Sequence, residues 1–180
     1  MFSDSFNRLF DFPVLLALRE AFACGTWDGW MRAVTAMGDH GTVWIALGVL
    51  LLIFRRTRMT GAAILLAIVL GALIGNLGLK PLFDRLRPCD IMGFTLLPAC
   101  PSDPSFPSGH TTASFASAAV LWFRRSVFFW PALVLAALIA FSRLYLFVHF
   151  PTDVMAGIVL GLCCAWCAVR AVEAFERRRS

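Results

Sequence analysis

Long apolar segments alternate with short polar connections along the chain, and this pattern predicts a bundle of membrane-spanning helices. Within each segment, apolar residues cover nearly every helical face, as expected where lipid or another helix surrounds it. A helix needs about 20 residues to cross a bilayer. The segments, of which the first is short, are Gly41–Phe54, Gly61–Leu79, Thr111–Phe123, Val127–Phe141 (or on to Val148) and Val154–Val172. The predicted fold is therefore all-α, an integral-membrane helical bundle of five full spans.

The first forty residues follow a different pattern. Pro13–Cys24 is apolar, but it is too short to cross a membrane alone and contains Arg19 and Glu20 near its centre. An arginine at the middle of a bilayer costs roughly 2.5–3.5 kcal/mol on insertion scales. Trp27–Met37 repeats apolar residues at helical spacing and carries its charged residues on another face, which is typical of an interfacial helix. We expect interfacial helices in residues 1–40, with a short sixth span as the alternative.

The composition agrees with a membrane protein. Hydrophobic residues make up 59% of the chain and charged residues 15%, with a mean hydropathy of +0.78. A soluble domain is usually about 45–50% apolar and about 25% charged. The net charge is +5, but the basic residues form short clusters between apolar segments rather than one patch with interleaved aromatic residues. We therefore expect no nucleic-acid partner, and the bilayer itself is the predicted surrounding of the chain.

The basic clusters predict the orientation of the bundle. They lie in alternate connections, at Arg55–Arg58, Arg124–Arg125 and Arg170–Arg179. The positive-inside rule makes this side cytoplasmic. The connection 80–107 and the corner around His149 then face outward, as they would from a bacterial cytoplasmic (inner) membrane. We expect one domain over residues 1–180, with the transmembrane bundle at 41–172.

Polar side chains gather in three stretches that this topology places on the outward face. Lys80 and Arg87 lie in the first stretch and are exceptions to the positive-inside rule. In the second stretch, Ser108 is a candidate N-cap of the third span, and the free N–H groups of a helix start bind anions. Gly109 lets an anion approach the backbone closely. These two stretches therefore predict an anion-binding site.

The third stretch adds a cation and a candidate nucleophile. Arg143 precedes the last span, and His149 and Asp153 lie four residues apart at its start. If the helix extends back to His149, the two side chains share one face and the carboxylate can orient the imidazole. With His110 of the second stretch, these residues supply proton transfer and a nucleophile. Such a set suits a tetrahedral oxyanion whose charge is spread over several oxygens.

The three stretches resemble the signature of the type-2 phosphatidic-acid phosphatase family, which reads K-x6-R-P, P-S-G-H and S-R-x5-H-x3-D. All three parts are present in order and without departure, and the resemblance covers roughly Gly61 to Leu160. A single part, such as P-S-G-H alone, would be weak support. Three complete parts, each at the outward end of a predicted span, make the resemblance specific.

The resemblance implies a role for each residue of the site. His149 attacks phosphorus, Asp153 holds its imidazole, and His110 acts first as general acid and then as general base for water. The implied phosphate cradle consists of Lys80, Arg87, Ser108, Arg143 and the backbone of Gly109. An unperturbed histidine titrates near pH 6.5, so one ring can be neutral while another is protonated. We expect no metal or other cofactor, because the carboxylates are too few for a two-metal site.

The signature indicates chemistry on a phosphate group but does not identify the lipid that carries it. A small chain with an outward site suits undecaprenyl diphosphate, and the alternatives are phosphatidic acid, phosphatidylglycerol phosphate and lipid A phosphates. Transfer of the phosphate to an alcohol instead of water is a related alternative. Outside the enzymes, the alternative is a lipid-phosphate binder or transporter, although binding alone needs no nucleophile such as His149. The sequence leaves the oligomeric state open.

The remaining polar residues and cysteines receive simpler interpretations. Cys89 and Cys100 flank the outward loop and predict a disulfide, with reduced thiols as the alternative. His40 is interpreted as a solvated turn residue. Asp84 and Arg85 either shape the loop, bind a head group or are solvated loop residues. Three cysteines of the last apolar segment are expected to be buried small side chains, namely Cys163, Cys164 and Cys167.

Overall fold

The computed structural model describes residues 7–22, 25–97 and 99–178, and every regular element in these ranges is a helix. The elements are η1 (Asn7–Asp11), α2 (Phe12–Phe22), α3 (Gly25–Met37), η2 (Asp39–Gly41), α4 (Thr42–Ile53), α5 (Arg58–Ala72), η3 (Leu73–Leu79), α6 (Lys80–Phe83), α7 (Pro88–Met92), α8 (Gly109–Phe123), α9 (Phe129–Tyr145) and α10 (Pro151–Arg177). The predicted all-α class is confirmed. The last two residues of the predicted Pro13–Cys24 segment and the end of the last basic cluster lie outside the described residues.

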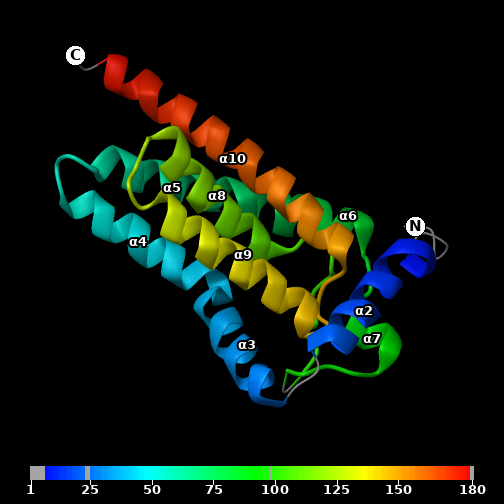
Figure 1. The fold of residues 1–180 in the computed structure, drawn as a ribbon. Helices are drawn as coiled ribbons and strands as arrows, with labels where there is room; N and C mark the ends of the chain where they lie inside the picture. The colour runs from blue at the N-terminus through cyan, green and yellow to red at the C-terminus, as the bar shows by residue number, and fades with distance from the viewer. Residues whose placement is uncertain (1–6, 23–24, 98, 179–180) are drawn as a thin grey trace.

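The long helices α4, α5, α8, α9 and α10 form the body of the bundle, and the short helices α6 and α7 lie with α2 at the end opposite the C-terminus (Figure 1). By length and composition, Arg58–Met92 and α10 can each cross a membrane. The 27 residues of α10 correspond to about 40 Å of helix. Trp27–Met37 and Asp39–Ile53 meet at a bend of 43° and together are long and apolar enough for one broken span. The predicted interfacial helix and the short first segment are therefore joined as a bent helix pair.

Helix α8 lies at the centre of the bundle, because α5, α9 and α10 all pack against it. Nine of its 15 residues are buried, and most of these are alanine, serine or threonine. Small side chains allow helices to approach closely in a membrane. A polar contact also crosses this core, since the indole Nε1 of Trp44 in α4 donates to Ser114 Oγ of α8 at 2.9 Å.

Two glycines of α10 bring its backbone directly against α8. A Cβ atom added at Gly157 would lie 2.8 Å from the carbonyl oxygen of Ser108, and one added at Gly161 would lie 2.7 Å from that of Thr112. These separations leave no room for a side chain. The N-terminal halves of α8 and α10 are therefore packed backbone against backbone.

The N-terminal helices α2 and α3 pack against α9. Met31 and Thr35 of α3 are buried there, whereas Trp27 and Trp30 are 50% and 67% exposed. One part of the apolar face predicted for Trp27–Met37 therefore packs against the protein, and the other part is exposed. Exposed tryptophans near a membrane surface are typical of interfacial anchoring.

The opposite end of the bundle contains an ion pair between Arg124 and Glu176, and three cysteines lie near the middle of α10. Arg124, which follows α8, donates to both carboxylate oxygens of Glu176 in α10, at 2.9 and 3.0 Å. Cys164 is buried as predicted, but Cys163 and Cys167 are exposed. The prediction was wrong for these two residues because neighbouring positions of a helix point to different faces, and only one of these faces packs against the bundle.

Candidate active site

The structure brings the predicted site residues together at the end of the bundle opposite the C-terminus, around one cavity of about 540 Å³. Six of the eight line this cavity, namely Lys80, Arg87, Gly109, His110, Arg143 and His149. The other two, Ser108 and Asp153, are fully buried and do not line it. Stretches of the chain separated by up to about seventy residues therefore meet at one place.

His149 lies in the buried turn between α9 and α10. The helix α10 begins at Pro151, so helical geometry does not extend back to His149 as the simplest prediction required. The Nδ1 atom of His149 is nevertheless 3.6 Å from Asp153 Oδ2 and 3.4 Å from Ser105 Oγ. Asp153 Oδ2 also accepts hydrogen bonds from the Ser105 hydroxyl and from the backbone N–H of Phe150. The carboxylate is thus fixed at the start of α10, behind the imidazole.

The contact between His149 and Arg87 identifies the tautomer of the imidazole. Arg87 Nη1 lies 3.1 Å from His149 Nε2, and a guanidinium carries only donors. Nε2 must therefore be the acceptor, and the proton of a neutral ring is then on Nδ1, facing Asp153 and Ser105. Burial lowers the pKa of His149 well below its usual value, and the charges of Arg87 and Arg143 act in the same direction. At neutral pH the ring is neutral, with a lone pair on Nε2.

Three buried cations surround the same cavity. Lys80, Arg87 and Arg143 are only 8%, 2% and 3% exposed. Arg143 Nη1 donates to Thr35 Oγ1 of α3 at 2.6 Å, while its Nε has no hydrogen-bond partner among the described residues. A buried donor without a partner is costly. An anion in the cavity would offset this cost, which is consistent with the predicted phosphate cradle.

Asp103, in the connection between α7 and α8, pairs with two of these cations. Its carboxylate contacts Lys80 Nζ and lies 2.9 Å from Arg87 Nη2, and Arg87 Nε donates to its backbone carbonyl at 2.8 Å. Burial alone would raise the pKa of Asp103, but the hydrogen bond from Lys80 and the charge of Arg87 lower it to about 2. Asp103 is therefore ionised throughout the neutral range. Asp103 was not among the predicted site residues, because an aspartate in an irregular loop follows no helical spacing or motif that would indicate its role.

Replacing Asp103 by asparagine is expected to strengthen the binding of anions. The carboxylate is 51% exposed and pairs with cations to which a phosphate would also bind. Removing its negative charge leaves these cations free to bind the phosphate. An exposed ion pair contributes about 0.2–1 kcal/mol, which corresponds to a roughly 1.4- to 5-fold lower inhibition constant for orthovanadate. Asp84→Asn removes an exposed carboxylate that does not line the cavity and serves as the control. Unchanged or weaker vanadate inhibition of Asp103→Asn would contradict this account.

His110 occupies the first turn of α8. Ser108 is the N-cap of this helix, as predicted, and its hydroxyl accepts from Thr111 Oγ1 at 3.0 Å. The Ser108 hydroxyl therefore makes its hydrogen bond within the first turn of the helix, whereas Gly109 and His110 line the cavity. His110 Nε2 lies 2.9 Å from Asp39 Oδ1 of the η2 turn. His110 was predicted from the sequence, but its partner Asp39 was not.

Arg85 is turned away from the cavity into a buried ionic network. Its Nη2 donates to Asp11 Oδ2 at 2.6 Å, and its Nη1 contacts Asp153 Oδ1 and Thr152 Oγ1. Asp11 is fully buried and also accepts from the Thr152 hydroxyl at 2.8 Å. These contacts agree with the interpretation of Arg85 as a loop-shaping residue and not with head-group binding. His40, the third histidine, is exposed at the edge of the cavity.

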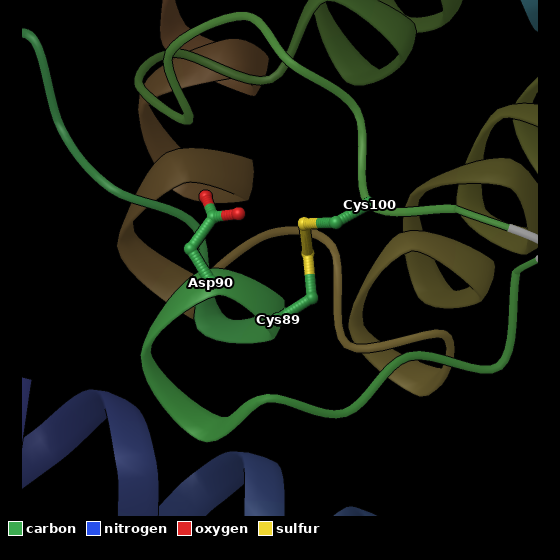
Figure 2. Close-up of side chains that lie close together, drawn as sticks. All are labelled: Cys89, Asp90 and Cys100. Carbon is green, nitrogen blue, oxygen red and sulfur yellow. A yellow bond between two sulfur atoms is a disulfide. The ribbon is translucent and has the colours of Figure 1, made fainter.

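Cys89 and Cys100 are paired as a disulfide in the structure, with Cα atoms 6.0 Å apart. Figure 2 shows Asp90 beside the two cysteines. Its carboxylate accepts from the backbone N–H of Arg87 at 3.1 Å. Asp90 and the two sulfurs lie close enough to hold a metal ion, but sulfurs bonded to each other are not thiolate ligands. The disulfide joins the segment after Arg87 to the segment before Asp103.

The disulfide is expected in the purified protein. In the predicted orientation this loop lies in an oxidising compartment, where such bonds persist. Mass spectrometry of the alkylated protein under non-reducing conditions should show the two cysteine-containing peptides as one cross-linked species. Free thiols at both Cys89 and Cys100 would contradict the prediction.

Comparisons with known proteins show which chains and folds this protein is similar to. The chain is 35% identical to the undecaprenyl-diphosphatase of Sulfolobus acidocaldarius, over 73% of this chain and 63% of that protein. The solved structure of Aquifex aeolicus LpxE superposes with a TM-score of 0.77 at 28% identity, covering 89% of this chain and 94% of that one. A transmembrane PAP2-type phosphatidylglycerolphosphate phosphatase from Bacillus subtilis has the same fold, with a TM-score of 0.72 at 24% identity and coverage of 99% and 90%.

The family of this chain is shown by a match that covers more than half of its residues. Residues 60–177 match the PAP2 superfamily, and this range contains all three parts of the predicted signature. The apolar helices and the membrane-embedded relatives also identify an integral membrane protein. The chain therefore belongs to the PAP2 superfamily, as its three-part signature predicted.

Proposed function

We propose that the protein is a membrane lipid phosphatase that removes phosphate through a covalent phosphohistidine on His149. The observation that carries this proposal is the position of His149 Nε2. This atom is an acceptor, lies 3.1 Å from the Arg87 guanidinium and belongs to a residue that lines the cavity with the cations Lys80 and Arg143. A neutral imidazole nitrogen next to several cations is placed to attack a bound phosphoryl group.

The first half of the reaction transfers the phosphoryl group to the protein. Nε2 of His149 forms a bond to phosphorus while the bond from phosphorus to the lipid oxygen breaks. The Nδ1–H of the resulting ring faces Asp153, whose carboxylate balances the positive charge that the ring acquires. His110 gives a proton to the departing lipid oxygen, so the lipid leaves as a neutral alcohol or a monophosphate.

The second half releases phosphate. His110, now without its proton, takes one from a water molecule as the oxygen of that water bonds to phosphorus and the P–N bond breaks. Inorganic phosphate leaves, and both histidines return to their starting states. In both halves the developing charge lies on the equatorial oxygens, where the guanidinium groups of Arg87 and Arg143 can donate to them.

The proposed location of the site is the outward face of a bacterial cytoplasmic membrane. The support comes from the arginine clusters at Arg55–Arg58, Arg124–Arg125 and after Arg170, which occupy the connections opposite to the cavity. The positive-inside rule places those connections in the cytoplasm. Cys89 and Cys100 lie on the cavity side, where a disulfide is stable.

The proposed substrate is undecaprenyl diphosphate. The name of the Sulfolobus acidocaldarius relative supports this choice. The cavity lining is also suitable, because it includes apolar residues from α5 and η3 as well as polar ones, namely Ile68, Gly71, Ala72 and Gly75. A single isoprenoid chain is narrow where it joins its phosphate. Phosphatidylglycerol phosphate, phosphatidic acid and lipid A phosphates are the alternatives, as is transfer to an alcohol acceptor.

The decisive experiment measures phosphate release from these four lipids by the purified protein in detergent, with a chelator present. We expect metal-independent release, fastest from undecaprenyl diphosphate. Release of the lipid product without an equal amount of phosphate, when an alcohol is added, would indicate phosphotransfer. Binding of the lipids without any release would show a binder or transporter and would contradict the proposal.

A further inference from the structure

The turn before α4 brings a carboxylate to the second histidine of the site. Asp39 Oδ1 lies 2.9 Å from His110 Nε2, and both residues line the cavity. Asp39 belongs to residues 1–59, which precede the part of the chain that matches the PAP2 superfamily, residues 60–177. The site therefore contains two pairs of histidine and aspartate, and one of them depends on the N-terminal region.

We propose that Asp39 is a positioning residue, which holds a proton on Nε2 of His110 and leaves Nδ1 to exchange the catalytic proton. This inference rests on the function proposed above. As general acid, the doubly protonated ring gives its Nδ1 proton to the lipid oxygen and keeps the Nε2–H that Asp39 accepts. As general base, Nδ1 then takes a proton from water. No other reactant is required.

The backbone around Asp39 is shaped to hold the carboxylate at the histidine. A Cβ atom added at Gly38 would lie 2.8 Å from Cδ2 of the His110 ring, so the turn touches the ring itself. His40 and Gly41 follow with positive φ angles of 53° and 72°, which non-glycine residues seldom adopt. The hydroxyl of Thr42 donates to the backbone carbonyl of Asp39. A tight turn therefore fixes both the ring and the carboxylate.

The charges around the cavity explain why His110 needs an anionic partner. The cations that face it are Arg143 from α9, Arg87 from the start of α7 and Lys80 from α6, and His149 adds a neutral ring. Nearby cations disfavour a protonated imidazole. Asp103 already pairs with Lys80 and Arg87, whereas Asp39 contacts the ring directly. Of the carboxylates in the described cavity lining, Asp39 is thus the one placed to stabilise the charged form of His110.

The test compares Asp39→Asn with the wild-type protein on the lipid phosphate that the wild type hydrolyses fastest. General acid–base catalysis contributes about 10²–10⁴ in rate, and loss of the orienting charge is expected to remove part of it, a roughly 10- to 100-fold lower kcat. KM should stay within about threefold, because Asp39 does not hold the phosphate. The basic limb of the pH–rate profile should move to lower pH, since the imidazolium loses its proton more easily without the carboxylate.

Two variants separate this role from a structural one. Asp39→Glu keeps the charge and should restore the pH profile and most of the rate. Asp84→Asn removes an exposed carboxylate outside the cavity and should behave as wild type. A normal kcat for Asp39→Asn, or a lower kcat with an unmoved basic limb, would overturn the inference. Absence of phosphate release by the wild type would instead refute the proposed function, so the two failures are distinguishable.

Discussion

Replacement of His149 by alanine is expected to lower the rate of phosphate release by about 10⁴-fold or more, because the variant has no atom to form the covalent intermediate. In the wild type, a substrate labelled in its terminal phosphate should leave label on the protein after a rapid quench. A phosphorus–nitrogen bond is stable in base and labile in acid, which distinguishes it from a phosphoserine. Phosphate release and protein labelling therefore measure the same step independently.

The matched control for this variant is His40→Asn. His40 is a histidine at the edge of the same cavity, exposed and with a positive φ of 53°, a conformation that asparagine tolerates. This control should retain labelling and turnover. Persistence of acid-labile label in His149→Ala, or its loss in His40→Asn, would show that the nucleophile is another residue.

Replacement of Arg85 by glutamine is expected to cause the largest loss of stability. Arg85 and Asp11 form an ion pair whose side chains are 4% and 0% exposed, and Arg85 also contacts Asp153. Removing the guanidinium leaves two buried carboxylates without their cation, and breaking a buried pair in this way costs about 3–5 kcal/mol. Thermal unfolding in detergent should show a much lower midpoint. Activity should fall as well, since Asp153 loses a group that fixes its position behind His149.

The control for Arg85→Gln is Arg124→Gln. Arg124 donates two hydrogen bonds to Glu176, but the side chains are 21% and 36% exposed, and solvent screens such a pair to about 0–1 kcal/mol. The double variant Arg85→Gln, Asp11→Asn should recover part of the loss, because one unpaired carboxylate is removed. Equal destabilisation by Arg85→Gln and Arg124→Gln would contradict the ionic network described here.

The helices and the residues that line the cavity could be predicted because both follow regular patterns. Apolar segments of span length have few structural alternatives, so α5, α8, α9 and α10 were identified within a few residues. The cations Lys80 and Arg87 were informative because they lie on the side that is predicted to face outward, where the positive-inside rule disfavours cations. The N-cap at Ser108 could also be predicted, since a serine immediately before an apolar segment is a typical N-cap.

Three carboxylates that support the site, unlike Asp153, could not be predicted. Asp11, Asp39 and Asp103 lie in η1, a tight turn and an irregular loop, and none follows a helical or strand period. Their partners are 74, 71 and 16 residues away in the sequence. The pairing of Asp11 and Asp39 depends on how the N-terminal region packs against the bundle, and that of Asp103 depends on the path of the loop before α8. Neither follows from a local pattern of residues.

The contact of Gly157 and Gly161 with α8 has a consequence for how the site can move. With no side chain between their backbones, we expect α8 and the start of α10 to move together. His110 and Asp153 are attached to these two helices. Under the proposed function, the lipid would enter through the remaining walls of the cavity, so that His110 and Asp153 would keep their relative positions.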